Sequence, residues 1–103
     1  MIDELLQKCN TILKEYYGSR FQGLLLYGSI ARGQADPSSD IDLLVLLKQP
    51  FDYFDELRRI IELLYPIQLE SDWLISAKPV LFHEYDQGRI QLYRNAKKDG
   101  VLV

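Results

Sequence analysis

The chain has 103 residues, of which 48% are hydrophobic and 26% charged, and this composition predicts one soluble globular domain over residues 1–103. The net charge of -3 and the pI of about 5.0 argue against nucleic acid as a partner, since a non-specific nucleic-acid surface needs excess lysine and arginine. The single cysteine excludes an internal disulfide, and we expect a cytoplasmic protein because no signal-peptide pattern or membrane-length apolar run is present.

The first predicted element is an amphipathic helix over residues 2–17, where apolar residues, Cys9 among them, recur at helical spacing. The run FQGLLLYG, residues 21–28, then predicts a short buried strand. SIARG is typical of a turn or the start of a helix, and QADPSS, residues 34–39, of a loop. The run DIDLLVLL, residues 40–47, predicts a second strand.

A second long helix is expected over residues 51–65, with Asp52 as its N-cap and Pro66 as its end. The residues expected to form its buried stripe are Phe54, Leu57, Ile60, Ile61 and Leu64. The run IQLESDWLIS, residues 67–76, predicts a third strand, and its polar face would carry Gln68, Glu70 and Asp72.

The chain ends with a predicted helix over residues 82–100, weakened by Gly88, and a short strand at residues 101–103. The connection between the first two strands is too short for a crossover helix, so these strands are expected to be antiparallel neighbours. The fold class predicted from this order is α+β, with a mixed sheet and helices packed on it.

Two aspartates, Asp40 and Asp42, open the second strand. Alternation places both on one face, about 6.6 Å apart along the strand. Two unpaired carboxylates this close repel each other, and a divalent cation resolves that conflict. Magnesium accepts one or two carboxylate ligands and completes its shell with water and phosphate oxygens. The alternative is ordinary turn chemistry, in which Asp40 caps a turn and Asp42 faces solvent.

Gly28 and Ser29 end the first strand. Glycine allows a phosphate to approach the backbone closely, and the serine hydroxyl and nearby amides can donate to it. If the two strands are antiparallel neighbours, this pair lies at the same sheet end as Asp40 and Asp42. A Gly-Ser pair alone is also common in turns.

The run GSIARGQADPSSDID, from Gly28 to Asp42, resembles the nucleotidyltransferase motif Gly-Ser-x-Ala-Arg-Gly, a short spacer, and Ser-Asp-x-Asp. This is the motif of the polymerase-β-like nucleotidyltransferase superfamily. The short chain resembles its minimal members, the MNT proteins, which are paired with HEPN-domain proteins.

The resemblance implies that Gly28 and Ser29 bind the β- and γ-phosphates of a nucleotide, and that Asp40 and Asp42 bind two magnesium ions. It further implies a third carboxylate on the next strand, beside the attacking hydroxyl. Asp72 is the assigned residue, because DWLIS begins the apolar half of the predicted strand, and Glu70 is the alternative.

Arg32 has two possible roles. It either neutralises triphosphate charge or braces the turn by pairing with Asp36 or a nearby carbonyl.

Two functions remain open from the sequence. The resemblance implies an enzyme that transfers AMP from ATP to a hydroxyl of a HEPN toxin, and the alternative is an antitoxin that neutralises its partner by contact. Leu44 and Leu46 share the face of the aspartates, so that face needs a cover. The cover would be the last helix of the chain, a second copy or a different protein.

Overall fold

The computed structural model describes residues 2–33 and 40–103, so the predicted loop at 34–39 lies outside the described residues. The helices are α1 (Ile2–Tyr17), α2 (Gly28–Ala31), α3 (Tyr53–Leu69), α4 (Phe82–Asp86) and α5 (Gln91–Asp99), with a 3-10 turn η1 (Gly18–Arg20). The strands are β1 (Phe21–Tyr27), β2 (Ile41–Leu47), β3 (Ile75–Leu81) and β4 (Val101–Leu102).

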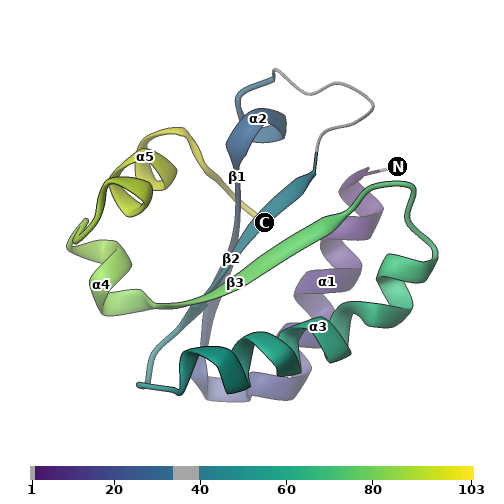
Figure 1. Cartoon of the computed structure of the whole chain (residues 1–103), viewed down its shortest axis with the longest axis horizontal. Helices are drawn as coiled ribbons and strands as arrows, with labels where there is room; N and C mark the ends of the chain where they lie inside the picture. Colours follow the sequence, from purple (N-terminus) through teal and green to yellow (C-terminus); the bar gives the residue numbers. More distant parts are fainter. Residues whose placement is uncertain (1, 34–39) are drawn as a thin grey trace.

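The described strands form one mixed sheet in the order β3-β2-β1-β4 (Figure 1). β1 pairs with β2 and with β4 in antiparallel fashion, whereas β2 and β3 are parallel. The predicted α+β class, the mixed sheet and the short final strand are therefore confirmed.

The sheet separates two apolar cores. α1 and α3 cover one face and α4 and α5 lie on the other (Figure 1). The larger core joins α1 and α3 to inward residues such as Leu24, Leu43 and Val45. The smaller core contains Leu25, Leu44, Leu46, Val80, Tyr85 and Ala96. Because β2 is covered on both faces, its sequence is a nearly continuous apolar run rather than an alternating one.

α1 has the bounds that the helical spacing predicts. Its buried residues are Leu6, Cys9, Leu13 and Tyr17. Burial raises the pKa of the Cys9 thiol to about 11, as expected of a core cysteine that is not reactive. The Tyr17 hydroxyl donates to Oε2 of Glu56 at 2.6 Å and so ties α1 to α3.

α3 begins as predicted but continues past Pro66. The Asp52 side chain accepts a hydrogen bond from the Asp55 amide at 3.0 Å, which confirms the N-cap. A proline removes one helical N–H and crowds the carbonyl four residues earlier, at Glu62. Both Pro66 and Glu62 are exposed, so water can satisfy that carbonyl, and the buried Ile67 holds the last turn against the sheet.

The buried stripe of α3 also differs from the prediction. Its buried residues are Ile60, Leu64 and Ile67, whereas Phe54 and Ile61 are exposed. Because the prediction ended the helix at Pro66, it did not include Ile67, which completes the i, i+4, i+7 spacing with Ile60 and Leu64.

The prediction of a third strand over residues 67–76 is wrong, since β3 begins at Ile75. Gln68 belongs to α3, and its side chain holds the following turn by donating to the Trp73 carbonyl at 3.0 Å and accepting from the Ile75 amide at 2.7 Å. Glu70 and Asp72 are exposed in this turn and do not occupy a strand face. The alternating polar residues that suggested a strand therefore belong to the end of α3 and to the hydrogen-bonded turn that follows it.

The predicted last helix is two helices, α4 and α5, with Gly88 between them at a φ of +63°. This left-handed conformation favours glycine and lets the chain turn back over the sheet. Across the described residues, no helix has both the length and the apolar character that crossing a membrane requires.

Candidate active site

The end of β1 lies beside the start of β2. Tyr27 is opposite Asp42 in the antiparallel register, so Gly28 follows directly next to this aspartate. Gly28 has a φ of +81°, and a Cβ added there would collide with Oδ2 of Asp42. The Asp42 carboxylate therefore lies against the Gly28 backbone, and the prediction that the Gly-Ser pair and the aspartates share one sheet end is confirmed.

The two aspartates differ in environment. Asp40, just before β2, is exposed, and Asp42, within β2, is partly buried. Burial is the main cause that raises the pKa of Asp42, and the negative charge of Asp40 raises it further. The positive charges of Lys78 and Arg32 act in the opposite direction. The carboxylates thus repel each other in a partly desolvated place, where a bound cation would be stabilising.

The short helix α2 connects these groups to Arg32. The Arg32 amide donates to the Gly28 carbonyl at 3.2 Å, and the exposed Arg32 side chain is near enough for its charge to lower the pKa of Asp42. Ser29, in the first turn of α2, is partly buried. Asp36, the predicted pairing partner of Arg32, lies outside the described residues.

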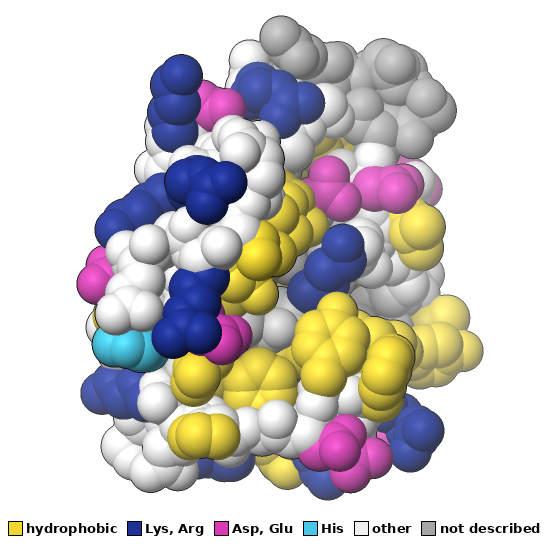
Figure 2. Space-filling view, turned by 60° about the vertical axis from the view of Figure 1, so that its left-hand side comes forward, with side chains coloured by type: hydrophobic (Ala, Val, Ile, Leu, Met, Phe, Trp, Pro, Cys, Tyr) yellow, Lys and Arg dark blue, Asp and Glu magenta, His cyan; other side chains and the backbone are white. Residues whose placement is uncertain are grey.

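Beyond Asp42, the same face of β2 carries Leu44 and Leu46, and both are buried under Tyr85 and Ala96. The last helices of the chain itself therefore provide the cover that the sequence left open. Figure 2 shows this side of the molecule, where hydrophobic side chains gather beside acidic and basic ones.

On the other side of Asp42 lies β3, whose sequence ISAKPVL contains no aspartate or glutamate. In the parallel register Ser76 is beside Asp42, and Lys78 is beside Leu44. The implied third carboxylate of the next strand is therefore not on β3. Sequence reasoning missed Ser76 and Lys78 because it placed the strand too early. A lysine within the mostly apolar run from Ile75 to Leu81 was the available signal.

Asp72 and Glu70 precede β3 and lie outside it. With Lys8 and Trp73 they line a pocket that Ile41 also contacts, and Ile41 packs in the larger core, on the opposite face of β2 from Asp42. Within residues 2–33 and 40–103, no three His, Cys, Asp or Glu side chains come together as a metal site. The described carboxylates at the site are thus Asp40 and Asp42, and a role for Asp72 stays a prediction that the placement of β3 no longer supports.

Comparison with known proteins decides the family. The family described as "Nucleotidyltransferase domain" matches residues 6–99. The chain belongs to this family. The mixed sheet, with the Gly-Ser pair and the aspartates at one end, is consistent with a polymerase-β-like nucleotidyltransferase.

Three proteins of Methanocaldococcus jannaschii, each named a "putative protein adenylyltransferase", are similar to this nucleotidyltransferase chain. MJ0141 is 34% identical over 82 residues, which cover 80% of this chain and 76% of that protein. MJ1305 is 46% identical over 48 residues, covering 47% and 30% respectively. MJ0604 is 36% identical over 70 residues, covering 64% and 70%.

Proposed function

We propose that this chain is a magnesium-dependent nucleotidyltransferase that transfers AMP from ATP to a hydroxyl group of a protein. The observation that carries the proposal is the contact between the Gly28 backbone and the Asp42 carboxylate, with Asp40 next to it. This arrangement supports the proposal because a backbone that could approach a phosphate lies close to two carboxylates that could bind a metal ion. The names of the similar proteins support adenylyl transfer to protein.

The donor set suits magnesium. Asp40 and Asp42 supply hard oxygen ligands of the kind this ion prefers, and their mutual repulsion in a partly buried place favours a cation between them. When bound, magnesium supplies positive charge that polarises the phosphates. Two carboxylates can hold one ion or share two, so the expectation of two ions remains part of the proposal.

The other residues bind and orient the nucleotide. The Ser29 hydroxyl and the backbone at Gly28 would donate to or lie against the β- and γ-phosphates, and Arg32 would neutralise part of their charge. The acceptor oxygen then bonds to the α-phosphorus, the bond to the β-phosphate oxygen breaks, and pyrophosphate leaves. The hydroxyl proton passes to a base, and Asp72 remains the candidate that mutation must test.

The proposed acceptor is a HEPN-domain partner protein, as the family resemblance of the Gly28–Asp42 motif implies. The burial of Leu44 and Leu46 by α4 and α5 removes one reason for expecting a partner, so this part of the proposal rests on the resemblance and on the names of the similar proteins.

The test is incubation of the chain with ATP, magnesium and the product of the neighbouring gene, followed by mass spectrometry of that product. The wild type should add AMP to that product, and Asp42→Asn should add none. Asp72→Asn should also add none if Asp72 is the base, and should add AMP as the wild type does if Asp72 is a dispensable surface residue. Full activity of a folded Asp42→Asn variant would contradict the assignment.

The second candidate function is neutralisation of the partner by contact alone. It is favoured by one observation, the absence of a carboxylate from β3 beside Asp42. In that case Asp42→Asn would still protect cells that express the partner, and neither protein would carry added mass.

A further inference from the structure

Lys78 lies at an unusual place on the sheet. On the face that carries Asp42, the neighbouring positions of β3 are Ser76 and Val80, and the neighbour on β2 is Leu44. Val80 and Leu44 belong to the smaller core, so the partly buried Lys78 stem borders an apolar surface. A lysine in such surroundings keeps its stem on apolar atoms and directs its ammonium to a polar region.

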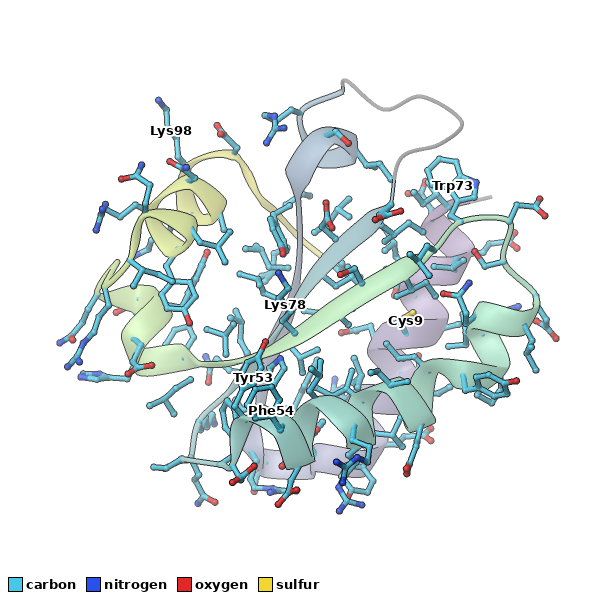
Figure 3. The ribbon with its side chains drawn as sticks, in the orientation of Figure 1. Cys9, Tyr53, Phe54, Trp73, Lys78 and Lys98 are labelled. Atoms are coloured by element: carbon cyan, nitrogen blue, oxygen red, sulfur yellow. The ribbon has the colours of Figure 1, made fainter. Side chains whose placement is uncertain are left out.

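The aspartate pair is a polar region on this face. Ser76 lies beside Asp42 in the parallel register, and Lys78 is the next residue of β3 on the same face, so Lys78 and Asp42 are diagonal neighbours on adjacent strands. None of the ion pairs and side-chain hydrogen bonds found among the described residues involves the Lys78 ammonium. Its donors are therefore not committed to any described side chain. Figure 3 shows Lys78 on β3, far from the exposed Lys98 of α5.

An alternative explanation is protection of the sheet edge. β3 is an edge strand, and lysines on edge strands discourage pairing with other chains. That role needs only an exposed charge on the strand. It does not account for a partly buried lysine on the same face as Asp42, between Ser76 and the buried Val80.

We propose that Lys78 is a phosphate-binding residue of the nucleotide site, whose ammonium donates to a phosphate oxygen of the nucleotide held beside Asp42. This inference rests on the proposed function. A nucleoside triphosphate next to two aspartates brings together many negative charges, which need several cations. Arg32 supplies one from the C-terminal end of α2, and Lys78 supplies another from β3, the strand that lacks a carboxylate.

The test measures binding of ATP with magnesium, and of adenosine, to the full chain by calorimetry. Lys78→Met keeps the length of the stem and removes the charge, and Lys98→Met is the matched control on α5. Loss of a hydrogen bond to a charged group predicts about a 10- to 150-fold weaker affinity for ATP in Lys78→Met. Adenosine binding should not change, Lys78→Arg should retain most of the ATP affinity, and Lys98→Met should behave as the wild type.

A second readout separates this role from a structural one. Without nucleotide, Lys78→Met should bind Mn²⁺ more tightly, because a repelling cation beside the aspartates is gone. A misfolded variant would lose affinity for both ATP and Mn²⁺. Thermal melting of Lys78→Met detects misfolding, and Lys78→Gln replaces it in the binding measurements if Lys78→Met does not fold.

The two levels of the proposal fail differently. If Lys78→Met binds ATP within about twofold of the wild-type affinity, the proposed role of Lys78 is wrong, and the proposed function of the chain is unaffected. Absence of ATP binding by the wild type overturns the proposed function as well.

Discussion

At the scale of single residues, Gly28 has two independent reasons to be glycine. Its φ of +81° is left-handed, and its missing Cβ leaves room for the Asp42 carboxylate. Gly18, with a φ of +57°, shares the first reason only, because nothing lies within 4 Å of the place of its Cβ. Comparing substitutions at Gly18 and Gly28 therefore separates the cost of a left-handed backbone from the cost of a steric collision with Asp42.

We predict that Gly18→Ala lowers the free energy of unfolding by roughly 1–2 kcal/mol, the cost of a left-handed alanine. Gly28→Ala should lower it further and should also weaken Mn²⁺ binding, since Asp42 must move. Urea denaturation and manganese titration of both variants check this. Equal destabilisation with unchanged metal binding would show that Asp42 does not need the space at Gly28.

Asp42 predicts a pH dependence of stability. Its pKa is raised in the folded chain, so the folded state holds a proton more tightly than the unfolded state does. The resulting stabilisation is fully present below the ordinary pKa of an aspartate and is lost as the pH rises through the raised value. At neutral pH the charged Asp42 is therefore destabilising when no metal is bound.

Asp42→Asn should accordingly stabilise the metal-free chain at neutral pH, and this gain should shrink as the pH falls through the raised pKa of Asp42 and be absent below the ordinary aspartate pKa. Denaturation midpoints across the pH range, with EDTA present, provide the measurement. A gain that is the same at every pH would mean that the ionisation of Asp42 is not its cause.

At the scale of elements, the sequence predicts best where one period extends over many residues. The spacing from Ile2 to Tyr17 defines α1, and the apolar run from Ile41 to Leu47 defines β2. These elements are long, so an error of one or two residues at either end does not change their identity. The antiparallel return between β1 and β2 follows from the shortness of their connection, and this return is what brings Gly28 next to Asp42.

The failure between residues 66 and 76 has a local cause. Proline normally ends a helix, but in α3 tertiary packing of Ile67 outweighs the missing hydrogen bond at the exposed Pro66. The polar residues that follow imitate a strand, although Gln68 and Ser71 hydrogen-bond to the turn around Trp73. The pattern therefore predicts a strand that begins too early, and it assigns Asp72 to a face that Ser76 and Lys78 occupy.

The position of Ser76 gives an element-scale prediction. Because Ser76 is beside Asp42 in the register of β2 and β3, Ser76→Asp would add a third carboxylate to the site. Mn²⁺ affinity should increase, and the metal-free chain should become less stable through like-charge repulsion. Ser19→Asp, on the exposed turn η1, adds the same charge elsewhere and should change neither property. An unchanged Mn²⁺ affinity in Ser76→Asp would place the metal away from β3.

At the scale of the whole molecule, the sheet separates two cores, and Asp42 belongs to neither of them. α1 and α3 close one face, while α4 and α5 close the other over Leu44 and Leu46. The chain thus buries both faces of β2 without another molecule. A partner is therefore not needed to cover this face of the sheet.

Whether the chain itself or a partner covers this face can be tested at Leu44, which has no exposed surface in the chain alone. If α4 and α5 cover it, Leu44→Ala should cost about 2–5 kcal/mol of unfolding free energy in the isolated chain, the usual range for a buried leucine. Leu69→Ala removes the same atoms from a side chain that is 68% exposed and should change stability by less than about 0.5 kcal/mol. If a partner covered the face instead, Leu44→Ala would be nearly neutral alone and would weaken the complex. Urea denaturation of the isolated chain therefore distinguishes a self-contained nucleotidyltransferase domain from one half of a shared core.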